Sequence, residues 1–100
     1  MLKVTFINRD REAEINLAGR IDSVAALDVE KTLLGKALHY DRVILNFSDV
    51  AYISSAGLRL LKKLNVAMKD RGGSVAIKNV RSDVMDVFKV TGFYRVFQFL

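Results

Sequence analysis

The sequence predicts a single α/β domain, spanning residues 1–100, in which helices pack on a mixed β-sheet. Three observations support this fold class. Two segments near the N-terminus alternate apolar with polar residues, as half-buried strands do. Three later segments place apolar residues three and four positions apart, which is typical of helices with one buried face. Short apolar runs separate these helices, and strands that alternate with helices imply parallel crossovers.

The N-terminal part predicts an antiparallel hairpin followed by a helix. Residues 2–6 and 13–17 are the alternating segments, and the polar residues 8–11 between them suit a turn. Ser23 is expected to cap a helix that runs from about residue 24 to residue 38. The buried face of this helix is predicted to comprise Ala26, Val29, Leu33 and Ala37.

The middle of the chain predicts one strand and one longer helix. Residues 43–47 are almost entirely apolar, which indicates a strand covered on both faces. The helix is expected from about residue 56 to residue 70, and Gly72 follows as the left-handed residue that commonly ends a helix. Its buried face is predicted to comprise Leu60, Leu61, Leu64, Ala67 and Met68.

The C-terminal part predicts a short buried strand at residues 75–77, a helix at residues 82–90 and a last strand at residues 97–99. Ser82 is the expected N-cap of this helix, and Gly92 is expected to end it. The first two strands pair in a hairpin and the others follow helices, so the sheet is predicted to be mixed.

Composition excludes several classes of function. The chain has no cysteine and one histidine, His39, so it has no disulfide, no thiolate metal site and little basis for histidine catalysis. No apolar run is long enough to span a membrane, and residues 1–12 lack the pattern of a secretory signal. We therefore expect a cytoplasmic binding or regulatory module that has no membrane contact, no metal and no cofactor.

The segment at residues 46–58 joins a predicted central strand to a helix, at the sheet edge where sites usually form. Ser54 and Ser55 are expected at the helix start, beside unpaired backbone N–H groups. Serine before a helix is more often only a cap. Gly57 costs about 1 kcal/mol relative to alanine inside a helix. It either leaves the serine open to an approaching surface or allows close packing against a neighbouring strand.

Residues 52–61, YISSAGLRLL, resemble the signature of STAS domains, in the branch of bacterial anti-sigma factor antagonists. The segment LAGRID at residues 17–22 is similar to the L-x-G-x-[LI]-D segment of that family. Residues 43–47 resemble its third strand, and the glycine after the second helix and TGF at residues 91–93 also fit. The resemblance covers nearly the whole chain and implies a single STAS-like domain with a mixed sheet.

The resemblance also implies a regulatory switch. The unphosphorylated antagonist binds an anti-sigma factor that is itself a serine kinase, and the sigma factor is released. Phosphorylation of a loop serine abolishes this binding until a serine phosphatase removes the phosphate. Carried over by position, the acceptor is Ser55. Ser54 and Asn46 stand where the family commonly has aspartate, which leaves Ser54 as a second candidate hydroxyl. Asp22 matches a family acid near the switch loop, or is a loop residue that contacts backbone N–H groups.

The predicted partner-binding surface surrounds the acceptor serine. It includes the basic face of the second predicted helix, which either contacts an acidic partner or is only solvated. The predicted residues are Asp22, Ser54, Ser55, Ala56, Gly57, Leu58, Arg59, Lys62 and Lys63.

Three other functions remain as alternatives. Catalysis by Ser55 needs a base, but His39 lies at the end of the first predicted helix, and Ile53 replaces the first glycine of G-x-S-x-G. The net charge of +5 makes nucleic-acid binding a second alternative. However, the basic residues are not interleaved with exposed aromatics, and the core is expected to take up Phe6, Phe47, Phe88 and Phe97. The third alternative is a STAS interaction module of a stress-signalling or transport assembly.

Overall fold

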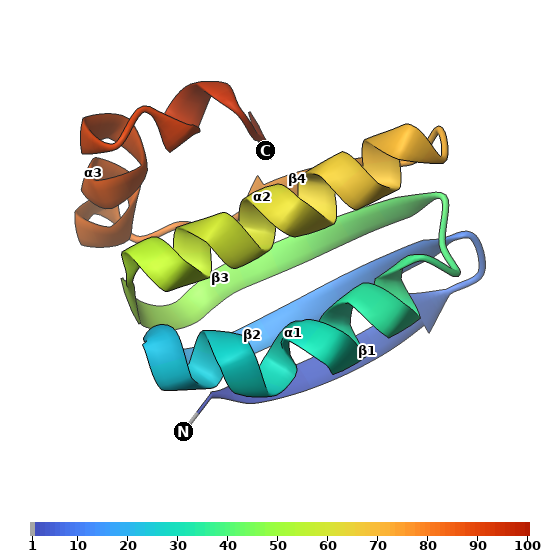
Figure 1. Cartoon of the computed structure of the whole chain (residues 1–100), viewed down its shortest axis with the longest axis horizontal. Helices are drawn as coiled ribbons and strands as arrows, with labels where there is room; N and C mark the ends of the chain where they lie inside the picture. Colours follow the sequence, from blue (N-terminus) through green and yellow to red (C-terminus); the bar gives the residue numbers. More distant parts are fainter. Residues whose placement is uncertain (1) are drawn as a thin grey trace.

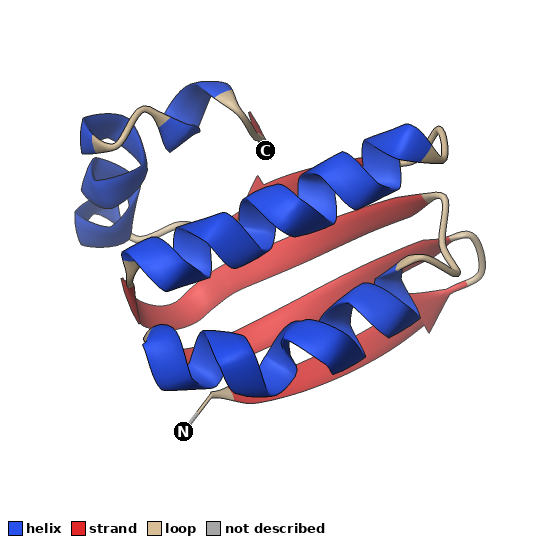
Figure 2. Cartoon of the chain, in the orientation of Figure 1, coloured by secondary structure: helices blue, strands red, loops and turns tan. Residues whose placement is uncertain are grey.

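The computed structural model describes residues 2–100, and it confirms the predicted mixed α/β fold. Five strands form one sheet, and three α-helices and one 3-10 helix connect them (Figures 1 and 2). The elements are β1 (Lys3–Arg9), β2 (Glu12–Ile21), α1 (Ser23–Ala37), β3 (Arg42–Ile53), α2 (Ser55–Asp70), β4 (Ser74–Lys78), α3 (Ser82–Val90), η1 (Phe93–Arg95) and β5 (Gln98–Phe99).

The strands lie in the sheet in the same order as in the chain, β1-β2-β3-β4-β5. β1 and β2 are antiparallel, and every later neighbour is parallel. Crossovers between parallel strands are almost always right-handed, so strands that are added in one direction carry their helices on one face. Figure 2 shows α1 and α2 side by side over the same face of the sheet.

The prediction that β3 is covered on both faces holds only for its first part, where the consecutive residues Val43, Ile44 and Leu45 are all buried. Its apolar side chains Val43, Leu45 and Phe47 point to the helix layer and are fully buried. Asn46 pairs in register with Asn16 on β2 and with Lys78 on β4, on the opposite face. In the part of the chain that the structure describes, no helix packs on that face, which explains why polar residues are tolerated there.

β3 is also longer than expected, because residues 48–53 continue the strand instead of forming a loop. In the pairing with β2, the partner shifts from Asn46 to Asp49 and again from Val50 to Tyr52, so β3 has an extra residue at each of two irregularities. Such bulges interrupt the alternation of apolar and polar side chains. This interruption, together with Ser48 and Asp49, makes the segment resemble a loop in sequence.

Two of the predicted helix caps are wrong. Asp22, rather than Ser23, caps α1: its carboxylate accepts a hydrogen bond from the Ala25 N–H at 2.8 Å. Arg81 occupies the N-cap position of α3 without a side-chain hydrogen bond, and Ser82 is the first helical residue. Carboxylates and hydroxyls compete for the same capping role, so a shift by one residue is easily missed. The prediction for Gly72 is confirmed by its φ of 80° after α2.

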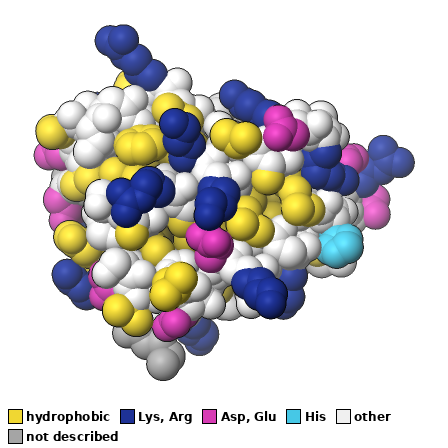
Figure 3. Space-filling view, in the orientation of Figure 1, with side chains coloured by type: hydrophobic (Ala, Val, Ile, Leu, Met, Phe, Trp, Pro, Cys, Tyr) yellow, Lys and Arg dark blue, Asp and Glu magenta, His cyan; other side chains and the backbone are white. Residues whose placement is uncertain are grey.

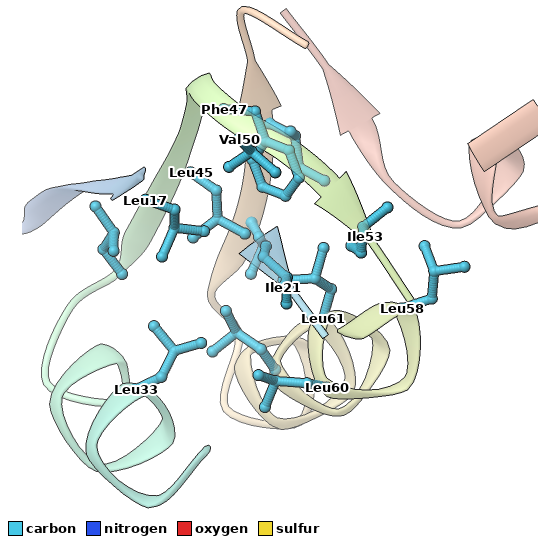
Figure 4. Close-up of a cluster of buried hydrophobic side chains, with 14 of the residues drawn as sticks. Leu17, Ile21, Leu33, Leu45, Phe47, Val50, Ile53, Leu58, Leu60 and Leu61 are labelled. Carbon is cyan, nitrogen blue, oxygen red and sulfur yellow. The ribbon is translucent and has the colours of Figure 1, made fainter. Parts of the chain in front are cut away.

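The core lies between the helix layer and the sheet, and Figure 4 shows side chains from β2, β3, α1 and α2 meeting there. The predicted helix faces agree with it, except that Val29 and Ala67 are only half-buried. Phe47, Phe88 and Phe97 are buried as expected, whereas Phe6 is half-buried.

Two contacts attach the C-terminal segment to this core. Phe88 on α3 packs against Phe97 and Phe99, with ring centroids 5.8 and 5.2 Å apart. The Asn65 side chain, which is buried in α2, donates to the Val96 carbonyl at 3.4 Å. Within residues 2–100, no helix has the length and hydrophobicity that crossing a bilayer requires.

Candidate functional site

The candidate site lies where β2 and β3 end side by side. Ile21 and Ile53 are register partners at these ends, and each is followed at once by a helix cap. The Ser54 N–H donates to the Ile21 carbonyl at 2.9 Å and holds the two connections together. The N-termini of α1 and α2 therefore lie at the same edge of the sheet, as Figure 1 shows.

The two neighbouring serines have different environments. Ser54 is the N-cap of α2 and is half-buried, and its hydroxyl accepts a hydrogen bond from the Gly57 N–H at 3.2 Å. Ser55 is the first residue of the helix and is exposed. The structure thus separates a hydroxyl that stabilises the fold from one that a second molecule can reach.

The surroundings of Ser55 favour a negative charge. The first N–H groups of a helix have no partner within it, and the helix dipole adds partial positive charge at this end. The Ser54 hydroxyl caps only the Gly57 N–H, so the N–H groups of Ser55 and Ala56 remain for an anion. Arg59 is exposed one turn further along the same helix.

Gly57 and Leu58 lie in the core, which corrects their predicted place on the partner-binding surface. Leu58 is only 1% exposed. A Cβ atom on Gly57 would lie 2.8 Å from both Ile21 Cγ2 and Ile53 Cγ1. The close-packing alternative for this glycine is therefore the correct one. Gly57 lets α2 begin in contact with the ends of β2 and β3.

The basic face of α2 is exposed, and Figure 3 shows Lys and Arg side chains over the helix layer. Arg59, Lys62 and Lys63 belong to it. Lys63 Nζ lies 3.3 Å from Glu30 Oε1 on α1, so one of the three charges is partly balanced. This face continues from Ser55 along α2.

Asp22, which matches an acidic residue of the family, and Asn46, which stands where the family commonly has aspartate, both have structural roles. Asp22, which is half-buried, caps α1, as its alternative interpretation proposed. Asn46 Oδ1 accepts hydrogen bonds from the Ser48 N–H at 3.1 Å and from Asn79 Nδ2 at 3.2 Å. It thus links the bulged part of β3 to the turn after β4.

His39 and Ser55 lie at opposite ends of α1. Ser55 is next to the start of this helix, and His39 follows its end. The 15 residues of α1 correspond to about 22 Å. The imidazole therefore does not reach the serine as a base. Among residues 2–100, no group of three or more histidine or acidic side chains is placed to hold a metal ion.

Sequence reasoning missed one feature near the site. The Arg20 guanidinium lies 4.2 Å from the centroid of the Tyr52 ring, and both residues are exposed at the ends of their strands. They are register partners. Only the pairing of β2 with β3, with its two bulges, brings them opposite each other.

Comparison with known proteins gives a consistent picture. The family model described as STAS domain matches residues 4–100. The anti-sigma-B factor antagonist of Bacillus subtilis strain 168 is 25% identical over 91 residues, which cover 91% of this chain and 84% of that protein.

Solved structures share the fold at lower identity. Protein TM1081 of Thermotoga maritima has a TM-score of 0.88 and 19% identity, covering 96% of this chain and 84% of that one. Unphosphorylated SpoIIAA has a TM-score of 0.75 and 16% identity, covering 100% and 87%. Phosphorylated SpoIIAA of Bacillus has a TM-score of 0.74 and 18% identity, covering 98% and 91%.

Proposed function

The chain belongs to the STAS domain family, and we propose that it is an anti-sigma factor antagonist controlled by phosphorylation of Ser55. In its unmodified form it binds an anti-sigma factor that is a serine kinase, and the sigma factor is freed. Phosphorylation of Ser55 ends this binding, and a serine phosphatase restores it. The protein acts in the cytoplasm by binding, without catalysis of its own. The name of the Bacillus subtilis relative supports the antagonist role.

One observation carries the choice of acceptor: Ser55 is exposed while its neighbour is engaged. A kinase must bring the hydroxyl into its own active site, so the acceptor has to project from the surface. Ser54 would have to give up the hydrogen bond to the Gly57 N–H, and lost caps cost about 1 kcal/mol. Ser55 can react without that loss.

A phosphate on Ser55 suits the free protein. It adds a charge of about −1.5 to −2 at neutral pH. At a helix N-terminus such a charge is stabilised by about 0.3–1 kcal/mol. SpoIIAA has been solved in unphosphorylated and phosphorylated forms, and this chain resembles both almost equally, with TM-scores of 0.75 and 0.74. This supports a switch that changes the surface and leaves the fold intact.

The acceptor can be mapped by mass spectrometry after incubation with ATP and each candidate anti-sigma factor kinase of the source organism. We expect one phosphate, on Ser55, and none in Ser55→Ala. Ser54→Ala should still be phosphorylated, although its free energy of unfolding should fall by about 1 kcal/mol through loss of the cap. Phosphate on Ser54 in the wild-type protein would contradict the assignment.

The basic face of α2 is proposed to steer an acidic surface of the kinase towards Ser55. Such steering raises association rates at low salt and falls as salt screens the charges. The association rate should therefore decrease steeply with ionic strength. This dependence should weaken in Lys62→Glu/Lys63→Glu, measured by stopped-flow mixing. The matched control is Lys89→Glu/Arg95→Glu, which reverses two exposed positive charges outside this face, on α3 and η1. Equal salt dependence in the two variants would mean that the basic face is only solvated.

A further inference from the structure

A groove runs between α1 and α2 on the outer side of the helix layer. Buried Ala26 and Leu60 lie at its base. Its walls are formed by Ser23, Leu27, Glu30, Ala56, Arg59 and Lys63. Ser23 and Ala56 belong to the first turns of their helices. A partner that covers Ser55 therefore reaches the open end of this groove.

Two aliphatic side chains are exposed at the same end. Val24 is 67% exposed and Leu27 is 77% exposed, both in the first turns of α1. A single exposed aliphatic side chain is ordinary on a protein surface. Here Leu27 forms part of the groove wall, whereas Val24, one turn before it, lines a different hollow together with Arg20 and Asp22. Burying Leu27 would give a partner apolar contact area in the groove, whose α2 wall begins at Ala56, the residue after Ser55.

The charges of the two rims differ. The charged side chain on the α1 rim is Glu30, and the α2 rim carries Arg59 and Lys63. Asp28 and Lys62 are exposed on the same two helices but do not line the groove. Lys63 is balanced by Glu30. A complementary occupant therefore has an apolar stripe with acidic side chains on the flank that faces α2.

The backbone decides what shape of segment fits. The N–H and C=O groups along α1 and α2 are bonded within the helices, so an extended peptide would find no main-chain partners in the groove. A helix satisfies its own backbone and can lay an apolar stripe between two helices. We propose that this groove receives an amphipathic, acid-flanked helix of the anti-sigma factor kinase, which rests on the proposed function.

Two other occupants fit less well. A second copy of this chain would present a groove instead of a ridge and would bring a second formal charge of +5. An anionic bilayer would attract the α2 rim. It would repel Asp28 and Glu30, which lie beside the side chains that would have to insert.

The test is calorimetric titration of the folded variants with the kinase that phosphorylates the wild-type protein. Leu27→Asp places a charge in the apolar wall and should weaken binding at least about tenfold. Val90→Asp is the matched control, because Val90 is an exposed aliphatic residue on α3, outside the groove. It should change affinity by less than about twofold. Circular dichroism melting establishes that both variants are folded.

A second measurement identifies the segment that occupies the groove. The chain has no cysteine, so Leu27→Cys provides a unique thiol for a photo-crosslinker. Mass spectrometry should place the crosslink on a helical, acidic segment of the kinase, and Val90→Cys should give no such crosslink. A crosslink to a non-helical segment of the kinase would overturn the proposal.

The remaining outcomes separate the two proposals. One outcome would contradict the groove proposal alone: the kinase binds the wild-type protein, does not bind the phosphorylated protein, and binds Leu27→Asp with unchanged affinity. The proposed phosphorylation switch would then still hold. If the kinase does not bind the unmodified protein, both fail. If Leu27→Asp leaves the affinity for the kinase unchanged and instead abolishes sedimentation with phosphatidylglycerol-containing vesicles, the occupant is a bilayer. If it instead abolishes self-association in ultracentrifugation, the occupant is a second copy of the chain.

Discussion

Phosphorylation of Ser55 is expected to weaken binding to the anti-sigma factor kinase by a factor of at least about 100, which corresponds to about 2.7 kcal/mol. In the free protein, the phosphate lies in water at the start of α2. In the complex it would be enclosed by the partner, and an unmatched charge that loses its water costs several kcal/mol. Titration calorimetry with the purified phosphorylated protein measures this effect, since aspartate is only a partial mimic of phosphate.

Matched variants separate the charge on Ser55 from general effects. Ser55→Ala should bind the kinase with nearly wild-type affinity, and Ser55→Asp should bind it more weakly. Ser82 is also an exposed serine at the first position of a helix, but it lies on α3. Ser82→Asp should therefore leave the affinity unchanged. If the phosphorylated protein is folded and still binds the kinase tightly, the electrostatic explanation is wrong.

Replacing Gly57 by alanine should destabilise the protein by about 1–3 kcal/mol, although alanine is the better helix former by about 1 kcal/mol. The added methyl group would lie 2.8 Å from Ile21 Cγ2 and Ile53 Cγ1 and 3.0 Å from the Ile21 carbonyl oxygen. Both side chains are buried, and the carbonyl is fixed by the Ser54 N–H, so the neighbours cannot easily withdraw. Urea unfolding of the two proteins measures the difference.

Gly35 provides the control, because it lies inside α1 and a Cβ there meets nothing within 4 Å. Gly35→Ala should therefore stabilise the protein by up to about 1 kcal/mol. Opposite signs for these two substitutions would show that packing decides the outcome at Gly57. If Gly57→Ala were stabilising as well, the start of α2 would not be held against the strand ends.

Much of the fold could be predicted from the sequence because periodicity reports which side of an element is buried. The stripe of α2 and the alternation in β1 and β2 gave the correct elements. The end of β3 could not be predicted this way, since two bulges break its alternation. The open face of the sheet could not be predicted either, because it follows from the spatial order of the strands, which leaves no mark on a single strand.

The candidate site, too, could be predicted from the sequence only in part. The sequence singled out Ser54 and Ser55 together, but only the hydrogen bond from the Gly57 N–H distinguishes a cap from an exposed hydroxyl. The role of Gly57 depended on Ile21, which is 36 residues earlier in the chain. Contacts between distant segments decide such cases, and a local motif does not contain them.

The agreement between strand order and chain order has a consequence for synthesis on the ribosome. Each strand that emerges finds the edge to which it pairs already made by the strand before it. No strand has to wait for a later one or insert between two neighbours that have already joined. The strands can therefore assemble progressively in chain order, and the short β5 pairs with β4 after the other four strands are in place.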